Sequence, residues 1–137
     1  MKRIIAIVAG GDSSEHDVSL RSAENIYSNL DKERYNVYIV EIKGLQWEAV
    51  LADGKRTTVD RNDFSFMNGE DRIHPDFAYI TIHGTPGENG ILQGYFDLIR
   101  MPYSSSNVLV EAMTFNKFTL NQYLKGFGVS VSESLIV

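Results

Sequence analysis

The chain has 137 residues, of which 43% are hydrophobic and 23% are charged. These values are typical of one globular domain, or of one domain and the start of another, and exclude a disordered or low-complexity chain. Lys and Arg number 13 and Asp and Glu 18, so the net charge of −5 argues against a general nucleic-acid binder. The chain has no cysteine, which excludes disulfides and thiolate metal sites and fits a reducing compartment.

The first elements alternate between strand and helix. The apolar run 4–8 is rich in Ile and Val and ends at Gly10-Gly11, which predicts a buried strand followed by a turn. Residues 14–30 carry apolar side chains at three- and four-residue spacing, which predicts an amphipathic helix. Its expected cap is Ser14 with Asp17, a Ser-x-x-Asp capping box. A second strand is predicted at 35–42.

The middle of the chain is less regular. A short strand is predicted at 47–51, a hairpin turn at Asp53-Gly54 and a returning strand at 55–59. Residues 64–71 are expected to form a polar loop that contains two aromatic side chains.

The last part of the chain continues the alternation. We expect a strand at 77–82, a glycine-rich loop at 83–90 and then a helix, with Pro102-Tyr103 as a short returning strand. The loop Ser104-Ser105-Ser106-Asn107 offers caps for a helix expected near 107–114. The final expected elements are a helix capped by Asn116 and strands at 129–131 and 134–137. The order predicts an α/β fold with three layers, in which a mainly parallel sheet has helices on both faces.

Two loops lie where ligands bind to such sheets, outside the carboxyl ends of the strands. In the first, Asp12, Glu15 and Asp17 place three carboxylates at the start of a helix, which favours a cationic ligand group such as an ammonium. The competing interpretation is that Glu15 only complements the helix dipole. His16 is expected to be a solvated residue of the first helical turn.

The second loop begins with His83 and Gly84. A histidine at the end of a strand can orient a substrate or simply form a local hydrogen bond, and glycines let backbone N–H groups face a ligand. His16, His74 and His83 lack metal-ligand spacing, and no G-x-S-x-G motif is present for a serine hydrolase.

Taken together, the motifs resemble the D-alanine–D-alanine ligases of the ATP-grasp family. The resemblance starts with the run Gly10-Gly11-Asp12-Ser13-Ser14-Glu15-His16-Asp17-Val18-Ser19-Leu20. It continues in order with residues 83–90, Leu92-Gln93-Gly94, residues 102–106, Ala112-Met113 and Lys117. It therefore spans essentially the whole chain.

The resemblance implies a Rossmann-like pre-ATP-grasp domain at 1–115 and the truncated start of a central ATP-grasp domain at 116–137. Such enzymes activate one D-alanine with ATP and Mg2+ as D-alanyl phosphate, which a second D-alanine attacks to give the dipeptide for peptidoglycan. Glu15 matches the residue that holds the first D-alanine's ammonium. Val18, His83 and Gly84 match the same substrate pocket, with Glu15 and His83 assigned to catalysis, and Lys117 matches a lysine near the ATP phosphates.

The resemblance further implies a cytoplasmic homodimer with no nucleic-acid or membrane partner. We expect the Mg2+ ligands to lie outside this chain, which would then be inactive alone and bind no cofactor. The chain has Phe115-Asn116-Lys117 where the family commonly has Met-Asp-Lys, and Asn and Asp both cap helices.

Two other functions stay open from the sequence. One is a D-alanine–D-lactate ligase, because the second substrate is selected outside this chain. The other is a non-catalytic amino-acid-binding module of the same fold. The apolar ending Ser134-Leu135-Ile136-Val137 favours a chain cut from a longer protein, and therefore an enzyme.

Overall fold

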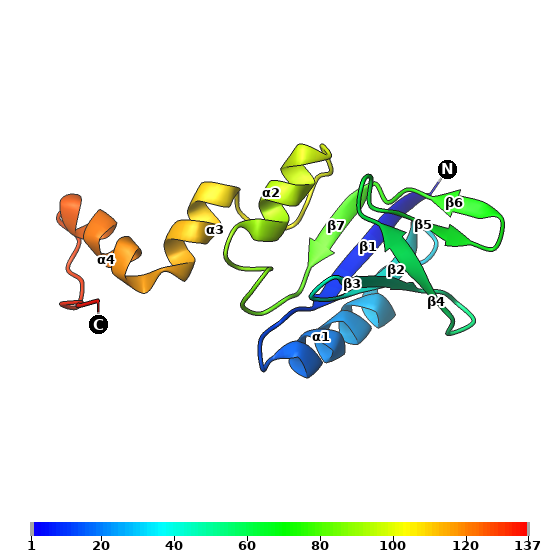
Figure 1. Cartoon of the computed structure of the whole chain (residues 1–137), viewed down its shortest axis with the longest axis horizontal. Coiled ribbons are helices and arrows are strands. Elements are labelled where there is room, and N and C mark those ends of the chain that lie inside the picture. Colours follow the sequence, from blue (N-terminus) through cyan, green and yellow to red (C-terminus); the bar gives the residue numbers. More distant parts are fainter. Residues whose placement is uncertain (1, 137) are drawn as a thin grey trace.

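The computed structural model describes residues 2–136, which form one seven-stranded sheet with helices packed on both faces (Figure 1). The strands are β1 (Arg3–Gly10), β2 (Tyr35–Lys43), β3 (Gln46–Val50), β4 (Arg56–Asp60), β5 (Ser65–Asn68), β6 (Asp71–Ile73) and β7 (Phe77–Ile80). The helices are α1 (His16–Asn29), α2 (Ile91–Leu98), α3 (Val108–Phe115) and α4 (Lys117–Gly126). The strand order is β6-β5-β4-β3-β2-β1-β7.

The sheet is mixed, and it contains more antiparallel pairs than the sequence predicts. β1 is parallel to both β2 and β7. The pairs β2–β3, β3–β4, β4–β5 and β5–β6 are antiparallel. The cause is local, because the predicted hairpin at Asp53-Gly54 joins β3 to β4 and a second hairpin at Gly69-Glu70 joins β5 to β6. The α/β class and the helices on both faces are confirmed.

β1 is the centre of the core. Strands pair with it on both edges and helices cover both of its faces, which explains its continuous run of Ile, Ala and Val. Ile5, Ile7 and Ala9 pack in the cluster that includes Ala23 of α1. Ala6 and Val8 belong to the opposite cluster, with Leu92 and Phe96 of α2. Alternation along one strand therefore holds a helix against each face.

The expected polar loop at 64–71 is wrong, because these residues contribute β5 and the start of β6. Phe64 is fully buried, and its ring centroid lies 5.1 Å from that of Phe96. Its backbone has a positive φ of 61°, which is unusual for a bulky residue and is held by the surrounding packing. The Asp63 carboxylate accepts hydrogen bonds from the Ser65 hydroxyl and N–H, which lower the pKa of Asp63. This Asx turn starts β5.

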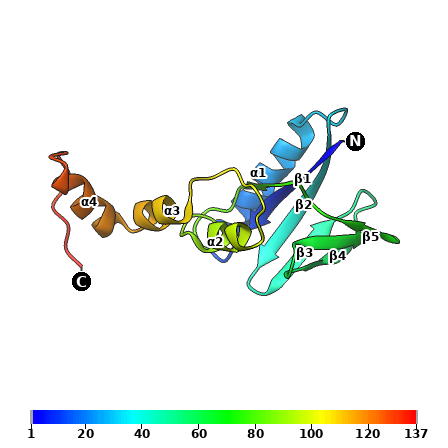
Figure 2. The ribbon, with the colours of Figure 1, turned by 90° about the horizontal axis from the view of Figure 1, so that it is seen from above.

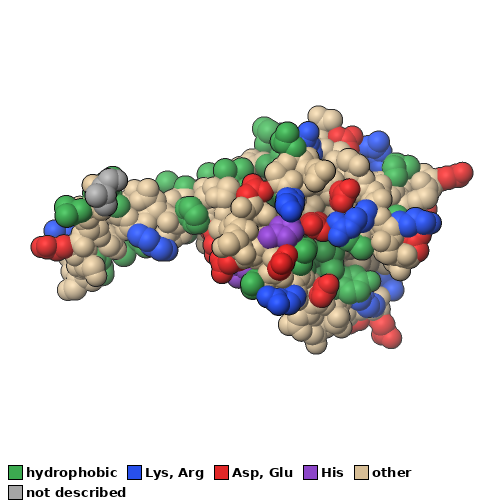
Figure 3. All heavy atoms as spheres, turned by 60° about the horizontal axis from the view of Figure 1, so that its bottom comes forward, with side chains coloured by type: hydrophobic (Ala, Val, Ile, Leu, Met, Phe, Trp, Pro, Cys, Tyr) green, Lys and Arg blue, Asp and Glu red, His purple; other side chains and the backbone are tan. Residues whose placement is uncertain are grey.

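The C-terminal helices project away from the sheet in both ribbon views (Figures 1 and 2) and form the narrow end in Figure 3. The expected caps are confirmed, because Asn107 accepts from the N–H of Val110 and Asn116 from that of Thr119. Neither α3 nor α4 contains a buried residue. The two strands expected at the end of the chain are wrong, because residues 129–131 and 134–136 pair with no strand within residues 2–136. Residue 137, the last position of the second expected strand, lies outside the described residues.

No helix within residues 2–136 is long and apolar enough to cross a membrane.

Candidate functional site

The two loops singled out in the sequence lie side by side. β1 and β7 are parallel neighbours, so the segments that follow them leave the same edge of the sheet. The Asp12 N–H donates to the Thr85 carbonyl at 2.9 Å, and the Ser13 hydroxyl donates to the His83 carbonyl at 2.8 Å. The structure therefore joins the first loop directly to the second.

Each of the two loops has a glycine at a position where its backbone lies against the other loop or the end of its strand. Gly11 has φ +92°, and a Cβ there would lie 2.5 Å from Cγ2 of Ile82. Gly84 has φ +74°, and a Cβ there would lie 3.1 Å from Cβ of Ser13. Side chains at these two positions would be strained in conformation and would separate the loops.

The start of α1 differs from the expected capping box. Glu15 is the N-cap residue and makes no side-chain cap hydrogen bond, and neither Ser14 nor Asp17 caps the helix. The Ser13 hydroxyl instead accepts from the Glu15 N–H at 3.2 Å. Because the helix begins one residue later than the motif assumes, Glu15 occupies the N-cap position, and its carboxylate is exposed at the positive end of the helix dipole.

Val18 lies one turn further along α1 and is 40% exposed. Its side chain is therefore not buried between the helix and the sheet. Glu15 and Val18 together present a carboxylate and a small apolar surface beside the first loop, groups of the kind that suit an ammonium and a methyl.

His83 is half-buried and lines a cavity of about 320 Å³ between the end of β7 and the segments that flank α2. The complete lining is Ser22, Ile80, Thr81, Ile82, His83, Gly87, Glu88, Ser105 and Glu111. Glu15 and Val18 are not part of this lining, and the structure links Glu15 to His83 through the Ser13 hydroxyl rather than through a shared cavity wall. The lining of the cavity mixes polar and apolar side chains, and the cavity is open to solvent.

Glu88 and Gln93 were not singled out by the sequence analysis, although both lie in the quoted motifs. The Glu88 carboxylate accepts from the Gly84 N–H at 2.6 Å and so fixes the left-handed turn. Gln93 is fully buried on α2, and its amide donates to the Gly87 carbonyl at 2.6 Å and to the Ser105 hydroxyl at 2.8 Å. The sequence signal for this role is a glutamine next to the apolar residues of a predicted helix, because a buried amide needs hydrogen-bond partners.

His16 is less solvated than expected. Its Nδ1 lies 2.9 Å from the Gly11 carbonyl and its Nε2 lies 3.3 Å from the Glu41 carboxylate on β2. The same carboxylate pairs with Arg56 at 2.6 Å, and this hydrogen bond raises the pKa of Arg56. Charged side chains of both signs surround a histidine on the face shown in Figure 3. His16 therefore braces the first loop against β2.

Lys117 lies apart from these loops, at the first position of α4. It is exposed, and its Nζ donates to the Thr114 carbonyl at 3.1 Å. Two of its three N–H donors remain for a phosphate, which a lysine binds as a point charge. Within residues 2–136, no three His, Asp or Glu side chains come together as metal ligands.

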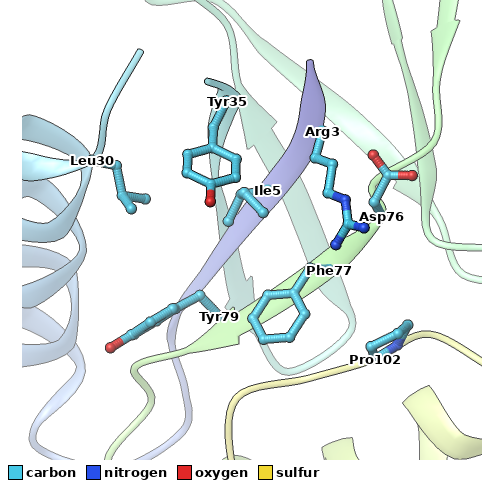
Figure 4. Close-up of a pocket in the computed structure, with 8 residues that line it drawn as sticks. All are labelled: Arg3, Ile5, Leu30, Tyr35, Asp76, Phe77, Tyr79 and Pro102. Carbon is cyan, nitrogen blue, oxygen red and sulfur yellow. The ribbon is translucent and has the colours of Figure 1, made fainter. Parts of the chain in front are cut away.

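A second cavity of about 320 Å³ lies at the opposite ends of β1 and β7 (Figure 4). The aromatic rings of Tyr35, Phe77 and Tyr79 lie around it, with Arg3 and Asp76 at one side. It shares no lining residue with the cavity beside His83. A larger cavity of about 700 Å³ also borders both loops, through Asp12, Thr85 and Pro86. The cavity beside His83 is the candidate functional site, because it contains a histidine at the carboxyl end of a parallel strand.

Residues 4–106 match the family model described as D-ala D-ala ligase N-terminus. The chain belongs to this family. A D-alanine–D-alanine ligase of Phocaeicola vulgatus is 73% identical over 137 residues, which are 100% of this chain and 42% of that protein. The Bacteroides fragilis ligase is 67% identical over the same shares of both chains. The chain thus spans 42% of the length of these curated relatives.

Solved structures agree with this family assignment. D-alanyl-alanine synthetase A from Vibrio cholerae matches with a TM-score of 0.81 and 31% identity, over 93% of this chain and 38% of that one. A D-alanine–D-alanine ligase from Bacillus anthracis complexed with ATP matches with a TM-score of 0.71 and 25% identity, over 96% and 39%. A D-Ala:D-Ser ligase from Enterococcus faecalis, at 24% identity and a TM-score of 0.82, shares the fold.

Proposed function

We propose that this chain is the N-terminal part of a D-alanine–D-alanine ligase that acts in peptidoglycan synthesis. In this proposal the full-length enzyme uses ATP to form D-alanyl phosphate, and the amine of a second D-alanine displaces the phosphate. The observation that carries the proposal is the pair of joined loops at the carboxyl edge of β1 and β7, in a chain 73% identical to a ligase of that name.

The first loop is proposed to bind the first D-alanine. The exposed Glu15 carboxylate faces no competing side-chain donor within residues 2–136, so it is free to accept hydrogen bonds from an ammonium. Such a charge-assisted bond is worth roughly 1.5–3 kcal/mol. Val18 is proposed to provide an apolar surface for the methyl group, and His83 and Gly84 are proposed to face the amino acid from the second loop. Holding the amino acid in this way orients its carboxylate for activation.

The domain division is also part of the proposal. Residues 1–115 form the substrate-binding domain, and residues 116–137 begin the central ATP-grasp domain. Asn116 has an extended backbone between α3 and α4 and caps the second helix, so the two helices are separate. Their lack of buried residues fits helices that receive their packing partners from the rest of a longer enzyme.

Lys117 is proposed to contact the ATP phosphates with the two N–H donors that Thr114 leaves free. Bound Mg2+ would neutralise charge on the phosphates during transfer, and we place its ligands outside this chain. We also propose that the full-length enzyme is a cytoplasmic homodimer without nucleic-acid or membrane partners. Light scattering of the purified full-length protein tests the dimer, and a monomer at working concentration would contradict it.

The decisive experiment measures phosphate release by the full-length gene product with ATP, Mg2+ and D-alanine, against an L-alanine control. D-specific release is expected, whereas residues 1–137 alone should release none. A folded full-length protein that releases no phosphate with either isomer would overturn the ligase and leave an amino-acid-binding module. A parallel assay with D-alanine and D-lactate together identifies the second substrate, because an ester product in place of the dipeptide would indicate a D-alanine–D-lactate ligase.

A further inference from the structure

One hydroxyl group touches both loops of the candidate site. Ser13 Oγ donates its proton to the His83 carbonyl at 2.8 Å and accepts from the Glu15 N–H at 3.2 Å. Glu15 and His83 are two of the residues proposed to bind the first D-alanine, and they come from different loops. Ser13 therefore fixes the backbone of one relative to the backbone of the other.

The two loops approach each other closely at Ser13. Gly84 lies against it so closely that a Cβ on Gly84 would be 3.1 Å from Ser13 Cβ and 3.5 Å from Ser13 Oγ. A second bond between the loops, from the Asp12 N–H to the Thr85 carbonyl, belongs entirely to the backbone. The Ser13 hydroxyl is thus the part of this junction that a side-chain substitution can remove.

We propose that Ser13 is a positioning residue, which sets the separation of Glu15 and His83 so that both meet the first D-alanine. This inference rests on the proposed ligase function. Ser13 does not need to touch the substrate, because its hydroxyl acts through the backbone of the residues that do. A shift of the order of 1 Å in a binding group can cost a large factor in rate or affinity.

The neighbouring serine provides a matched control. Ser14 has the same side chain, lies in the same loop and is exposed, and its hydroxyl makes no hydrogen bond within residues 2–136. Ser14→Ala therefore removes a hydroxyl without removing a link between the loops. Ser13→Thr keeps the hydroxyl and serves as the rescue variant.

The test is steady-state kinetics of the full-length enzyme with D-alanine and ATP varied separately. Ser13→Ala should raise the KM of the first D-alanine about tenfold, equivalent to about 1.4 kcal/mol, and leave the KM of ATP within about twofold. Ser14→Ala should match the wild type, and Ser13→Thr should recover most of the loss. Equal KM values for Ser13→Ala and Ser14→Ala would overturn the inference.

A second measurement does not depend on activity. Amide hydrogen exchange of the 137-residue chain should become faster at Glu15 and across residues 83–88 in Ser13→Ala but not in Ser14→Ala, because the link between the loops is lost. Unchanged exchange would overturn the positioning role even if the enzyme is a ligase. Faster exchange in a full-length protein that releases no phosphate with D-alanine would keep the structural link, but it would refute both the ligase and the substrate-positioning role.

Discussion

The amide of Gln93 on α2 donates to the carbonyl of Gly87 in the second loop at 2.6 Å, in a fully buried position. The same nitrogen donates to the Ser105 hydroxyl, while the amide oxygen has no hydrogen-bond partner within residues 2–136. The bond ties the loop that carries His83 to the helix that follows it. Loop geometry at the site therefore depends on a residue inside the core.

Gln93→Met tests this brace, because methionine has a similar length and no hydrogen-bond donor. The buried Gly87 carbonyl then loses its amide partner, and we expect the free energy of unfolding to fall by about 1–3 kcal/mol. Urea denaturation of the 137-residue chain measures the change. Gln46→Met, at an exposed position of β3, is the control and should stay close to the wild type. Equal stability of the two variants would contradict the role of Gln93.

Phe64→Ala tests the aromatic cluster between α2 and the β3–β5 strands. The Phe64 ring is fully buried and lies 5.1 Å from Phe96 and 6.0 Å from Trp47, measured between ring centroids. Its truncation should lower the free energy of unfolding by about 3–5 kcal/mol, because a cavity remains in a packed core. Phe127→Ala removes a ring that is 71% exposed and should have little effect. Similar losses in both variants would show that Phe64 is not a core residue.

Glu15→Gln tests the substrate role of the first loop in the full-length enzyme. The amide keeps the shape of the side chain but removes the charge that faces the ammonium, so the KM of the first D-alanine should rise far more than the KM of ATP. Glu24→Gln, at an exposed position of α1, should change neither constant. If Glu15→Gln also leaves both unchanged, Glu15 returns to its alternative role as a helix-dipole residue.

We expect the stability of the fold to fall at alkaline pH because of Tyr95. Burial, together with the negative charges of Asp63 and Asp60, raises the pKa of Tyr95 to about 12, and its hydroxyl donates to the Arg61 carbonyl. Because the folded-state pKa lies above the unfolded value of about 10, its stabilising contribution is complete below pH 10. That contribution is lost as the pH rises through about 12.

Tyrosinate absorbance during an alkaline titration measures this behaviour. Tyr95→Phe should remove the step near pH 12 and weaken the loss of stability between about pH 10 and 12. Tyr123→Phe, at a half-exposed position of α4, is the matched control and should retain that step. Persistence of the step in Tyr95→Phe would assign it to another tyrosine.

The sequence predicted the elements whose signals are local. The apolar run of β1, the spacing in α1 and the caps Asn107 and Asn116 all agree with the structure, because periodicity and capping act over a few residues. The two loops were also found in advance, since glycines and polar residues directly after strands mark the ligand edge of an α/β sheet.

The tertiary structure decided which serine in the first loop is used. The capping-box pattern selects Ser14, which has Asp17 three positions later, but the fold brings the His83 carbonyl to Ser13, from 70 positions away. It likewise turned residues 65–68 into a strand and buried Phe64, because β4 and the aromatic cluster supply partners that the local sequence cannot reveal. Local propensity fixes the elements with strong periodic or capping signals, whereas contacts between residues distant in the sequence determine the strand at 65–68 and how the site residues meet.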